Sequence, residues 1–254
     1  MTKLPHTPSF DLTGKKVLVT GASSGIGLGC AMAVAEAGAQ TYCAARGIER
    51  LNGAVEAMQS AGLDAIALPL DQSDVTAVAE THKEQVFDVV VNSAGIARHS
   101  AAIDTTEQDY DAVMHVNLRS AYFLSAHAAK AMISAEKPGS IIHISSQMGH
   151  TGGVDRALYC AAKHGLEGMI KAMAMEWGKQ RVRINSVCPT FIRTPFTEAT
   201  FADPERLAWI MSKIKLDRVG EVEDIMGAVQ YLASDASAMV TGTSLLIDGG
   251  WTAG

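Results

Sequence analysis

A glycine-rich stretch, Thr20–Gly27, constrains the fold more than any other segment of this chain. It reads Thr-Gly-Ala-Ser-Ser-Gly-Ile-Gly, and it stands between the apolar run 16–19 and an alanine-rich segment that suits a helix. A strand, a glycine turn and a helix in this order are typical of a dinucleotide-binding site. Gly21 permits a sharp turn, Gly25 and Gly27 permit close approach of the backbone, and the helix directs free N–H groups at an anion. The alternative is an ordinary glycine-rich connection.

The rest of the chain alternates apolar runs with helix-like segments, which predicts an α/β fold with a doubly wound, Rossmann-type parallel sheet. The run 87–92 is nearly all apolar, as are strands buried on both faces of a parallel sheet. The seven expected strands are 17–20, 41–45, 65–70, 87–92, 140–145, 182–187 and 244–247. The expected helices are 26–37, a segment ending at 58, one capped by Ser73 or Asp74, 107–133, 158–177, one starting at Asp203-Pro204, and 222–232.

We expect a single domain over residues 11–254, because no linker or internal repeat interrupts the pattern. Residues 1–10 hold two prolines and no periodicity, which predicts a flexible N-terminal arm. The less regular segment 194–216 is predicted to be a lid over the substrate.

The composition excludes several classes of function. The chain has 254 residues and a net charge of -6, with no block of like charge, so nucleic acid and anionic membranes are not expected as partners. It shows no secretory signal and no apolar run of membrane-spanning length. Its four cysteines lack CxxC spacing and lie in apolar segments, which indicates reduced thiols in the cytoplasm. No metal site is expected.

Polar residues follow several of the expected strands, at the edge where ligands of such sheets bind. Arg46 ends the second strand, where an acid would bind a ribose hydroxyl and an arginine can pair with a 2′-phosphate, so NADP(H) is favoured over NAD(H). Tyr159 and Lys163 are four residues apart on one helix face, and Ser145-Ser146 ends the preceding strand. The ammonium is expected to lower the tyrosine pKa toward neutrality, which suits acid–base catalysis. No glycine elbow or histidine–carboxylate pair activates the serine for hydrolysis.

From Leu12 to Trp251, the sequence resembles the short-chain dehydrogenase/reductase family. The motifs that carry the resemblance, in chain order, are Thr20–Gly27 for TGxxxGxG, Asn92-Ser93-Ala94-Gly95 for NNAG, Asn117, Ser146 and Tyr159-x-x-x-Lys163. Three positions depart from common patterns: Ser93 replaces asparagine, Thr190 replaces the glycine after Pro189, and Ser24 stands where many NADP enzymes of the family carry a basic residue.

The resemblance implies an NAD(P)-dependent oxidoreductase that interconverts a secondary alcohol and a ketone. It implies that Tyr159 is the general acid or base, that Lys163 lowers its pKa and holds the nicotinamide ribose, and that Ser146 polarises the substrate oxygen, with Ser145 as the weaker alternative. Asn117 would position a water in a proton relay. The expected cofactor-binding residues are Gly21, Ser23, Ser24, Gly25, Ile26, Gly27, Arg46, Asp71, Asn92, Ala94, Gly95, Tyr159, Lys163, Pro189, Ile192 and Thr194.

The substrate segments of the family supply a polar, cationic set of side chains in this chain, which indicates a small polyol, sugar or sugar acid. The residues expected to contact it are Arg98, Ser146, Gln147, His150, Arg156, Tyr159, Phe191 and Trp209, with His99 and Arg193 in the same segments. One alternative is a 3-oxoacyl thioester (acyl-carrier-protein) reductase, which the acidic chain does not favour. Another is a non-catalytic cofactor-binding regulator. The family also implies a homotetramer.

Overall fold

The structure, a computed structural model, describes residues 4–254, so the first three residues of the predicted arm lie outside the described part. Residues 4–10 form neither helix nor strand. Their end is nevertheless attached to the domain, because the Ser9 carbonyl accepts a hydrogen bond from the Ala236 amide (3.2 Å) and Phe10 packs against Tyr231.

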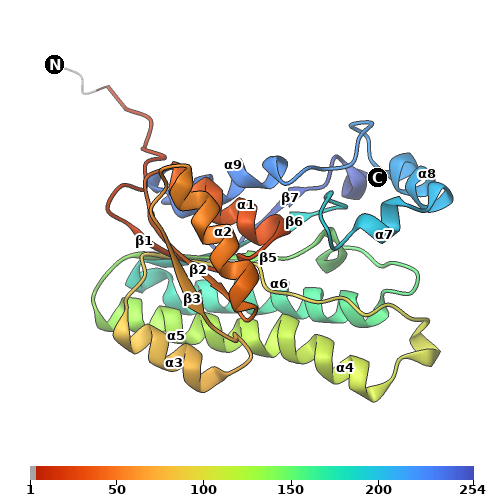
Figure 1. The fold of residues 1–254 in the computed structure, drawn as a ribbon, viewed down its shortest axis with the longest axis horizontal. Coiled ribbons are helices and arrows are strands. Elements are labelled where there is room, and N and C mark those ends of the chain that lie inside the picture. The colour runs from red at the N-terminus through yellow and green to blue at the C-terminus, as the bar shows by residue number, and fades with distance from the viewer. Residues whose placement is uncertain (1–3) are drawn as a thin grey trace.

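Seven parallel strands form one sheet, as the sequence predicts, and their order is β3-β2-β1-β4-β5-β6-β7 (Figure 1). The strands are β1 Lys16–Thr20, β2 Gln40–Ala45, β3 Ala65–Pro69, β4 Val89–Asn92, β5 Gly139–Ile144, β6 Val182–Pro189 and β7 Ser244–Ile247. The order reverses between β1 and β4, and ligands of doubly wound sheets bind beyond the strand ends at this point.

Helices cover both faces of the sheet (Figure 1). They are α1 Gly25–Glu36, α2 Ile48–Ser60, α3 Val75–Glu84, α4 Glu107–Met114, α5 Ser120–Ser134, α6 Ala157–Trp177, α7 Glu198–Phe201, α8 Pro204–Lys213 and α9 Glu223–Ala233. One apolar core lies between the sheet and α1, α2 and α9, and a second lies between the sheet and α3, α5 and α6. No described helix is both long and apolar enough to cross a membrane.

Local chemistry accounts for the starts of two helices. The Asp74 carboxylate, not Ser73, caps α3 by accepting hydrogen bonds from the Thr76 and Ala77 amides. Asp203 caps α8 in the same way, ahead of a proline in the first turn, where a missing N–H costs nothing.

The predicted helix 107–133 is interrupted by a π-helical turn, His115–Arg119, between α4 and α5. Both the amide and the hydroxyl of Ser120 donate to the His115 carbonyl, the hydroxyl at 2.7 Å. Turns of this kind are frequent at functional sites, because they redirect side chains within a helix. Here the turn contains Asn117.

The predicted lid segment carries α7 and α8, which stand apart from the sheet at the same end of the molecule as the C-terminus (Figure 1). A small apolar cluster joins it to its neighbours in the chain, because Ile210 and Ile214 are buried together with Val219 and against Phe191 and Trp251. The role of the segment as a lid stays a prediction.

Candidate active site

The larger of two adjoining cavities, about 360 Å³, lies above the glycine turn and the ends of β1, β2 and β4. Most of the predicted cofactor-binding residues line it. They are Gly21, Ser23, Ser24, Gly25, Ile26, Gly27, Arg46, Asp71, Ala94, Gly95, Tyr159, Lys163 and Thr194. Pro189 and Ile192 line the neighbouring cavity instead, where they meet Thr194.

The glycines of this turn are there because side chains do not fit. A Cβ on Gly21 would lie 2.9 Å from the Ala94 amide nitrogen, and the Gly21 φ of 69° disfavours other residues as well. A Cβ on Gly27 would overlap the Gly21 carbonyl. The turn therefore brings bare backbone and the N-terminus of α1 to the cavity, an arrangement that fits a dinucleotide pyrophosphate.

The rim of this cavity at the end of β2 is cationic. Arg46 and Arg50 are both exposed and both line the cavity. Arg50 was not predicted, because it lies inside α2 and only the helix geometry brings it beside Arg46. Two guanidinium groups at this edge are suited to an anionic substituent on the adenosine ribose.

Asn92 does not line either cavity, although cofactor contact was predicted for it. Its side chain is buried and joins three strands. Asn92 Oδ1 accepts a hydrogen bond from the Thr20 hydroxyl (3.1 Å), and Nδ2 lies 3.0 Å from His143 Nδ1. The asparagine therefore fixes the ends of β1, β4 and β5 beneath the cofactor cavity.

The second cavity, about 300 Å³, adjoins the first where Ser145 and Tyr159 line both. Five predicted substrate-contacting residues line it, namely Ser146, Gln147, Arg156, Tyr159 and Phe191. The lid adds Phe196, Thr197 and Thr200, which the sequence analysis did not single out. The fold of the lid brings these three residues to the cavity, and no local sequence motif predicts that they line it.

The structure brings the predicted catalytic side chains Ser146, Tyr159 and Lys163 together. The Ser146 hydroxyl lies near enough to the Tyr159 phenol to lower the pKa of that phenol. Lys163 Nζ lies 5.7 Å from the centre of the phenol ring and donates to the Ile144 carbonyl at 3.0 Å. The lysine is buried, so the bond to this carbonyl fixes its position.

The expected fall in the tyrosine pKa is wrong for this geometry. Burial raises the pKa of Tyr159 to about 12, and the nearby Ser146 hydroxyl opposes this rise. Burial also lowers the pKa of Lys163 to about 8, since desolvation penalises its charge. In the protein alone, the positive charge of Lys163 therefore does not offset the effect of desolvation on the Tyr159 pKa.

Asn117 does not line either cavity, and its side chain is fully used. Its Oδ1 accepts from the Ile96 amide (2.9 Å), and its Nδ2 donates to the Ile96 carbonyl (2.8 Å). This pair of bonds holds the loop that follows β4, which carries Ala94 and Gly95 along the cofactor cavity. The geometry gives the Asn117 side chain a positioning role, and the water contact implied by the resemblance stays a prediction.

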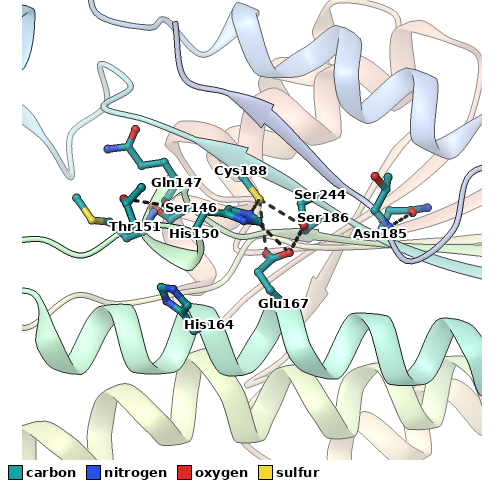
Figure 2. A network of polar contacts seen from close by, with 12 residues as sticks. Ser146, Gln147, His150, Thr151, His164, Glu167, Asn185, Ser186, Cys188 and Ser244 are labelled. Carbon is teal, nitrogen blue, oxygen red and sulfur yellow. Dashed lines mark hydrogen bonds and ion pairs between the residues drawn. The ribbon is translucent and has the colours of Figure 1, made fainter. Parts of the chain in front are cut away.

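Three predicted substrate contacts lie outside the second cavity. Arg98 is exposed and pairs with Asp109 at 2.8 Å. Trp209 packs against Trp251, with ring centres 5.4 Å apart. The His150 ring turns away toward Cys188 and Glu167 (Figure 2). Each of these residues has the expected polarity or size, but its side chain contacts another residue of the fold and does not reach the cavity.

The second cavity is short of negative charge. Arg156, 9% exposed, donates to the Asp155 carbonyl, and within residues 4–254 no carboxylate lies within ion-pair distance of it. Burial and Arg206 lower the pKa of Arg156, which still leaves it charged. Burial and Arg156 lower the pKa of His99, another lining residue, to about 4, so this histidine is neutral near pH 7.

Buried polar atoms also lack partners around this cavity. Ser145 Oγ, Gln147 Oε1 and Thr190 Oγ1 make no hydrogen bond to any described residue. All three residues line the cavity. Because unpaired buried polar groups are costly, Gln147 Oε1 and Thr190 Oγ1 are suited to the hydroxyls of a ligand.

Comparisons with known proteins agree with this geometry. A family model described as Enoyl-(Acyl carrier protein) reductase matches residues 21–252. The 2-dehydro-3-deoxy-D-gluconate 5-dehydrogenase of Escherichia coli is 34% identical over 252 residues, which cover 96% of this chain and 98% of the relative.

Solved structures are similar over the whole fold. An NADP-bound crystal structure from Agrobacterium tumefaciens has a TM-score of 0.93 and 38% identity, covering 96% of this chain and 99% of that one. A gluconate 5-dehydrogenase from Burkholderia cenocepacia, in complex with NADP and tartrate, has a TM-score of 0.93 and 30% identity, covering 96% and 98%.

Fold, site and comparisons together define a nicotinamide-dependent oxidoreductase that acts on an alcohol or ketone. The chain belongs to the short-chain dehydrogenase/reductase family.

Proposed function

We propose that this enzyme interconverts the ketone and secondary alcohol of a small sugar acid, with NADP(H) as its cofactor. The observation that carries the proposal is Arg156, a buried guanidinium that lines the second cavity, lacks a carboxylate partner among the described residues and stands three positions before Tyr159. A substrate carboxylate would pair with it in a bidentate manner. The sugar-acid names of the relatives and the tartrate in the Burkholderia structure support the same class.

The cofactor preference rests on Arg46 and Arg50, which would bracket a 2′-phosphate at the rim of the cofactor cavity. The NADP in the related crystal structures supports this preference. NAD(H) lacks that phosphate and would leave both guanidinium groups unused.

In the proposed mechanism, the bound nicotinamide supplies or accepts the hydride. Tyr159 donates its phenolic proton to the ketone oxygen in reduction and removes the proton in oxidation, while Ser146 donates a hydrogen bond to the same oxygen. Lys163, held by the Ile144 carbonyl, keeps a positive charge near the phenol. The lid threonines would close over the substrate and exclude water.

The test is a matched pair of substrates, a keto-sugar acid and the neutral ketose of the same chain length, with NADPH. We expect Arg156→Gln to raise KM for the acid about 10-fold to 100-fold, the loss of a charge-assisted hydrogen bond, and to leave the neutral ketose unchanged. Arg98→Gln, at an exposed arginine outside the cavity, is the matched control. Faster turnover of an acetoacetyl thioester than of either sugar would overturn the proposal in favour of an oxoacyl thioester reductase.

The proposal extends to the assembly and location of the enzyme. A homotetramer is supported by exposed apolar side chains on elements that the family uses for assembly, namely Tyr122 on α5, Met175 on α6 and Leu246 on β7. A cytoplasmic location is supported by Cys30, Cys43, Cys160 and Cys188, which are all buried and free. Light scattering of the purified protein tests the first statement.

A further inference from the structure

His150, Glu167 and Cys188 converge behind the second cavity, although they belong to three different elements (Figure 2). His150 follows the short turn after β5, Glu167 lies one helical turn beyond Lys163 on α6, and Cys188 is near the end of β6. Glu167 and Cys188 are buried, while about a quarter of the His150 side chain is exposed. Nothing in the proposed mechanism uses these three side chains.

The distances among the ligand-type atoms of the three residues approach those of a coordination sphere. His150 Nε2 lies 3.5 Å from Cys188 Sγ and 3.9 Å from Glu167 Oε2, and Cys188 Sγ lies 3.6 Å from the other carboxylate oxygen, Oε1. One ligand atom from each residue lies within 4.8 Å of the other two. Tetrahedral zinc with ordinary bond lengths holds neighbouring nitrogen, oxygen and sulfur ligands roughly 3.3–3.6 Å apart. The three side chains would therefore need to move closer together to bind a cation.

Two serine hydroxyls already orient the Glu167 carboxylate. Glu167 Oε2 accepts hydrogen bonds from the Ser186 hydroxyl (2.8 Å) and the Ser244 hydroxyl (2.5 Å). Outer partners of this kind fix the ligands of metal sites and sustain their affinity.

A buried polar atom beside the cluster also lacks a partner. Ser145 is 5% exposed, and its hydroxyl lies beside the Cys188 thiol, near enough to lower the pKa of that thiol. Yet Ser145 Oγ makes no hydrogen bond with the described residues. A water on a bound cation would satisfy it.

We propose that His150, Glu167 and Cys188 form a binding site for a borderline-soft divalent cation of the Zn²⁺ class. The donor set of one imidazole, one carboxylate and one thiolate selects such an ion over Mg²⁺ or Ca²⁺, which prefer all-oxygen ligands. Three protein ligands leave a fourth position for water. The partly exposed His150 ring gives the ion a route from solvent.

The ion would bind the thiolate form of Cys188, so its coordination displaces the thiol proton to solvent. The divalent charge would offset both the thiolate and the Glu167 carboxylate. The metal would tie the turn after β5 to α6 and β6.

The experiment begins with chelator-treated full-length protein and a Co²⁺ titration followed by absorption, with Zn²⁺ competition by calorimetry. We expect one ion per chain, a thiolate-to-cobalt charge-transfer band, and no competition by Mg²⁺. Cys188→Ser should abolish the band. Ser244→Ala should weaken metal binding about 10-fold to 100-fold, because it removes a hydrogen bond that orients the Glu167 carboxylate.

Two controls keep the test decisive. His150→Ala removes a ligand at the exposed edge with little risk to folding, and it should remove the increase in melting temperature that Zn²⁺ gives the parent protein. His164→Ala, at a histidine that Figure 2 shows apart from the cluster, and Cys43→Ser, at a cysteine on β2, should bind as the parent does. No stoichiometric Co²⁺, a spectrum without a thiolate band, or equal binding by His150→Ala would overturn the proposal.

Discussion

Asn92 Nδ2 and His143 Nδ1 lie 3.0 Å apart in the core, between β4 and β5. An amide nitrogen only donates, so His143 Nδ1 accepts and the imidazole is neutral, with its proton on Nε2 facing the Ser125 hydroxyl at 2.8 Å. Full burial lowers the pKa of His143 to about 3. The sheet beneath the cofactor cavity is therefore held by a histidine that must stay uncharged.

This contact predicts that stability falls with acid. Below about pH 6.5 the histidine binds a proton in the unfolded chain, whereas in the folded chain it does so only near pH 3, so protons favour unfolding across this window. We expect the free energy of unfolding to fall by up to about 1.4 kcal/mol per pH unit for this group. Urea unfolding at pH 7.5 and pH 5.5 measures the change.

His143→Gln should flatten that pH dependence, whereas His164→Gln, at an exposed histidine, should leave the slope as it is. His82 adds to the slope in the parent, because burial lowers its pKa to about 4 as well. An unchanged slope in a folded His143→Gln protein would contradict the assignment.

Asn117 gives a second prediction. Asn117→Ala removes both bonds to Ile96 and leaves an amide and a carbonyl without partners, at a cost of about 1–3 kcal/mol for each group. The freed loop should raise the KM for NADPH more than it lowers kcat, because the residue acts through the cofactor cavity. Asn117→Asp keeps an acceptor for the Ile96 amide but sets a buried carboxylate oxygen against the Ile96 carbonyl, so it should not restore the KM for NADPH. A loss of kcat alone would instead support the water contact implied by the family resemblance.

The local motifs predicted the fold and the centre of the site. The glycine turn and Tyr159-x-x-x-Lys163 depend on neighbours in sequence, and a parallel sheet then places their ends at one edge. The sequence therefore located the cofactor cavity, the serine beside the tyrosine, and the parallel seven-stranded sheet.

The direction of single side chains was not predictable in the same way. Asn92, Asn117 and His150 have partners 51, 21 and 38 residues away, and only the folded chain brings those partners close. The π-helical turn that carries Asn117 also breaks the regular helix spacing from which its direction would be judged.

The tyrosine pKa was missed for a different reason. The helix spacing placed Lys163 correctly, but the size of the desolvation depends on how deeply the folded chain buries both groups. Sequence spacing carries no measure of that burial.

The cationic rim of the cofactor cavity predicts how cofactor choice can be changed. Arg46→Ala and Arg50→Ala should each raise the KM for NADPH about 10-fold, with little change for NADH, because only NADPH carries the 2′-phosphate that the guanidinium groups would bind. Steady-state rates with both cofactors measure the shift. Arg193→Ala serves as a control, since Arg193 is paired with Glu221 outside this cavity. An equal increase for the two cofactors would show that the arginines support the turn and do not recognise the phosphate.

The buried phenol gives the last prediction. Tyr159→Phe removes only the hydroxyl, so the ring still packs edge-on against His99, with ring centres 6.0 Å apart, and both cavities keep their shape. We expect kcat to fall by a factor on the order of 10² to 10⁴, the usual contribution of a positioned acid or base, while NADPH affinity measured by fluorescence quenching changes little. Ser145→Ala should lower kcat much less than Ser146→Ala, because only the Ser146 hydroxyl lies near enough to the phenol to lower its pKa. Undiminished turnover by Tyr159→Phe would show that the proton comes from another group, and equal effects at the two serines would remove the distinction drawn between them.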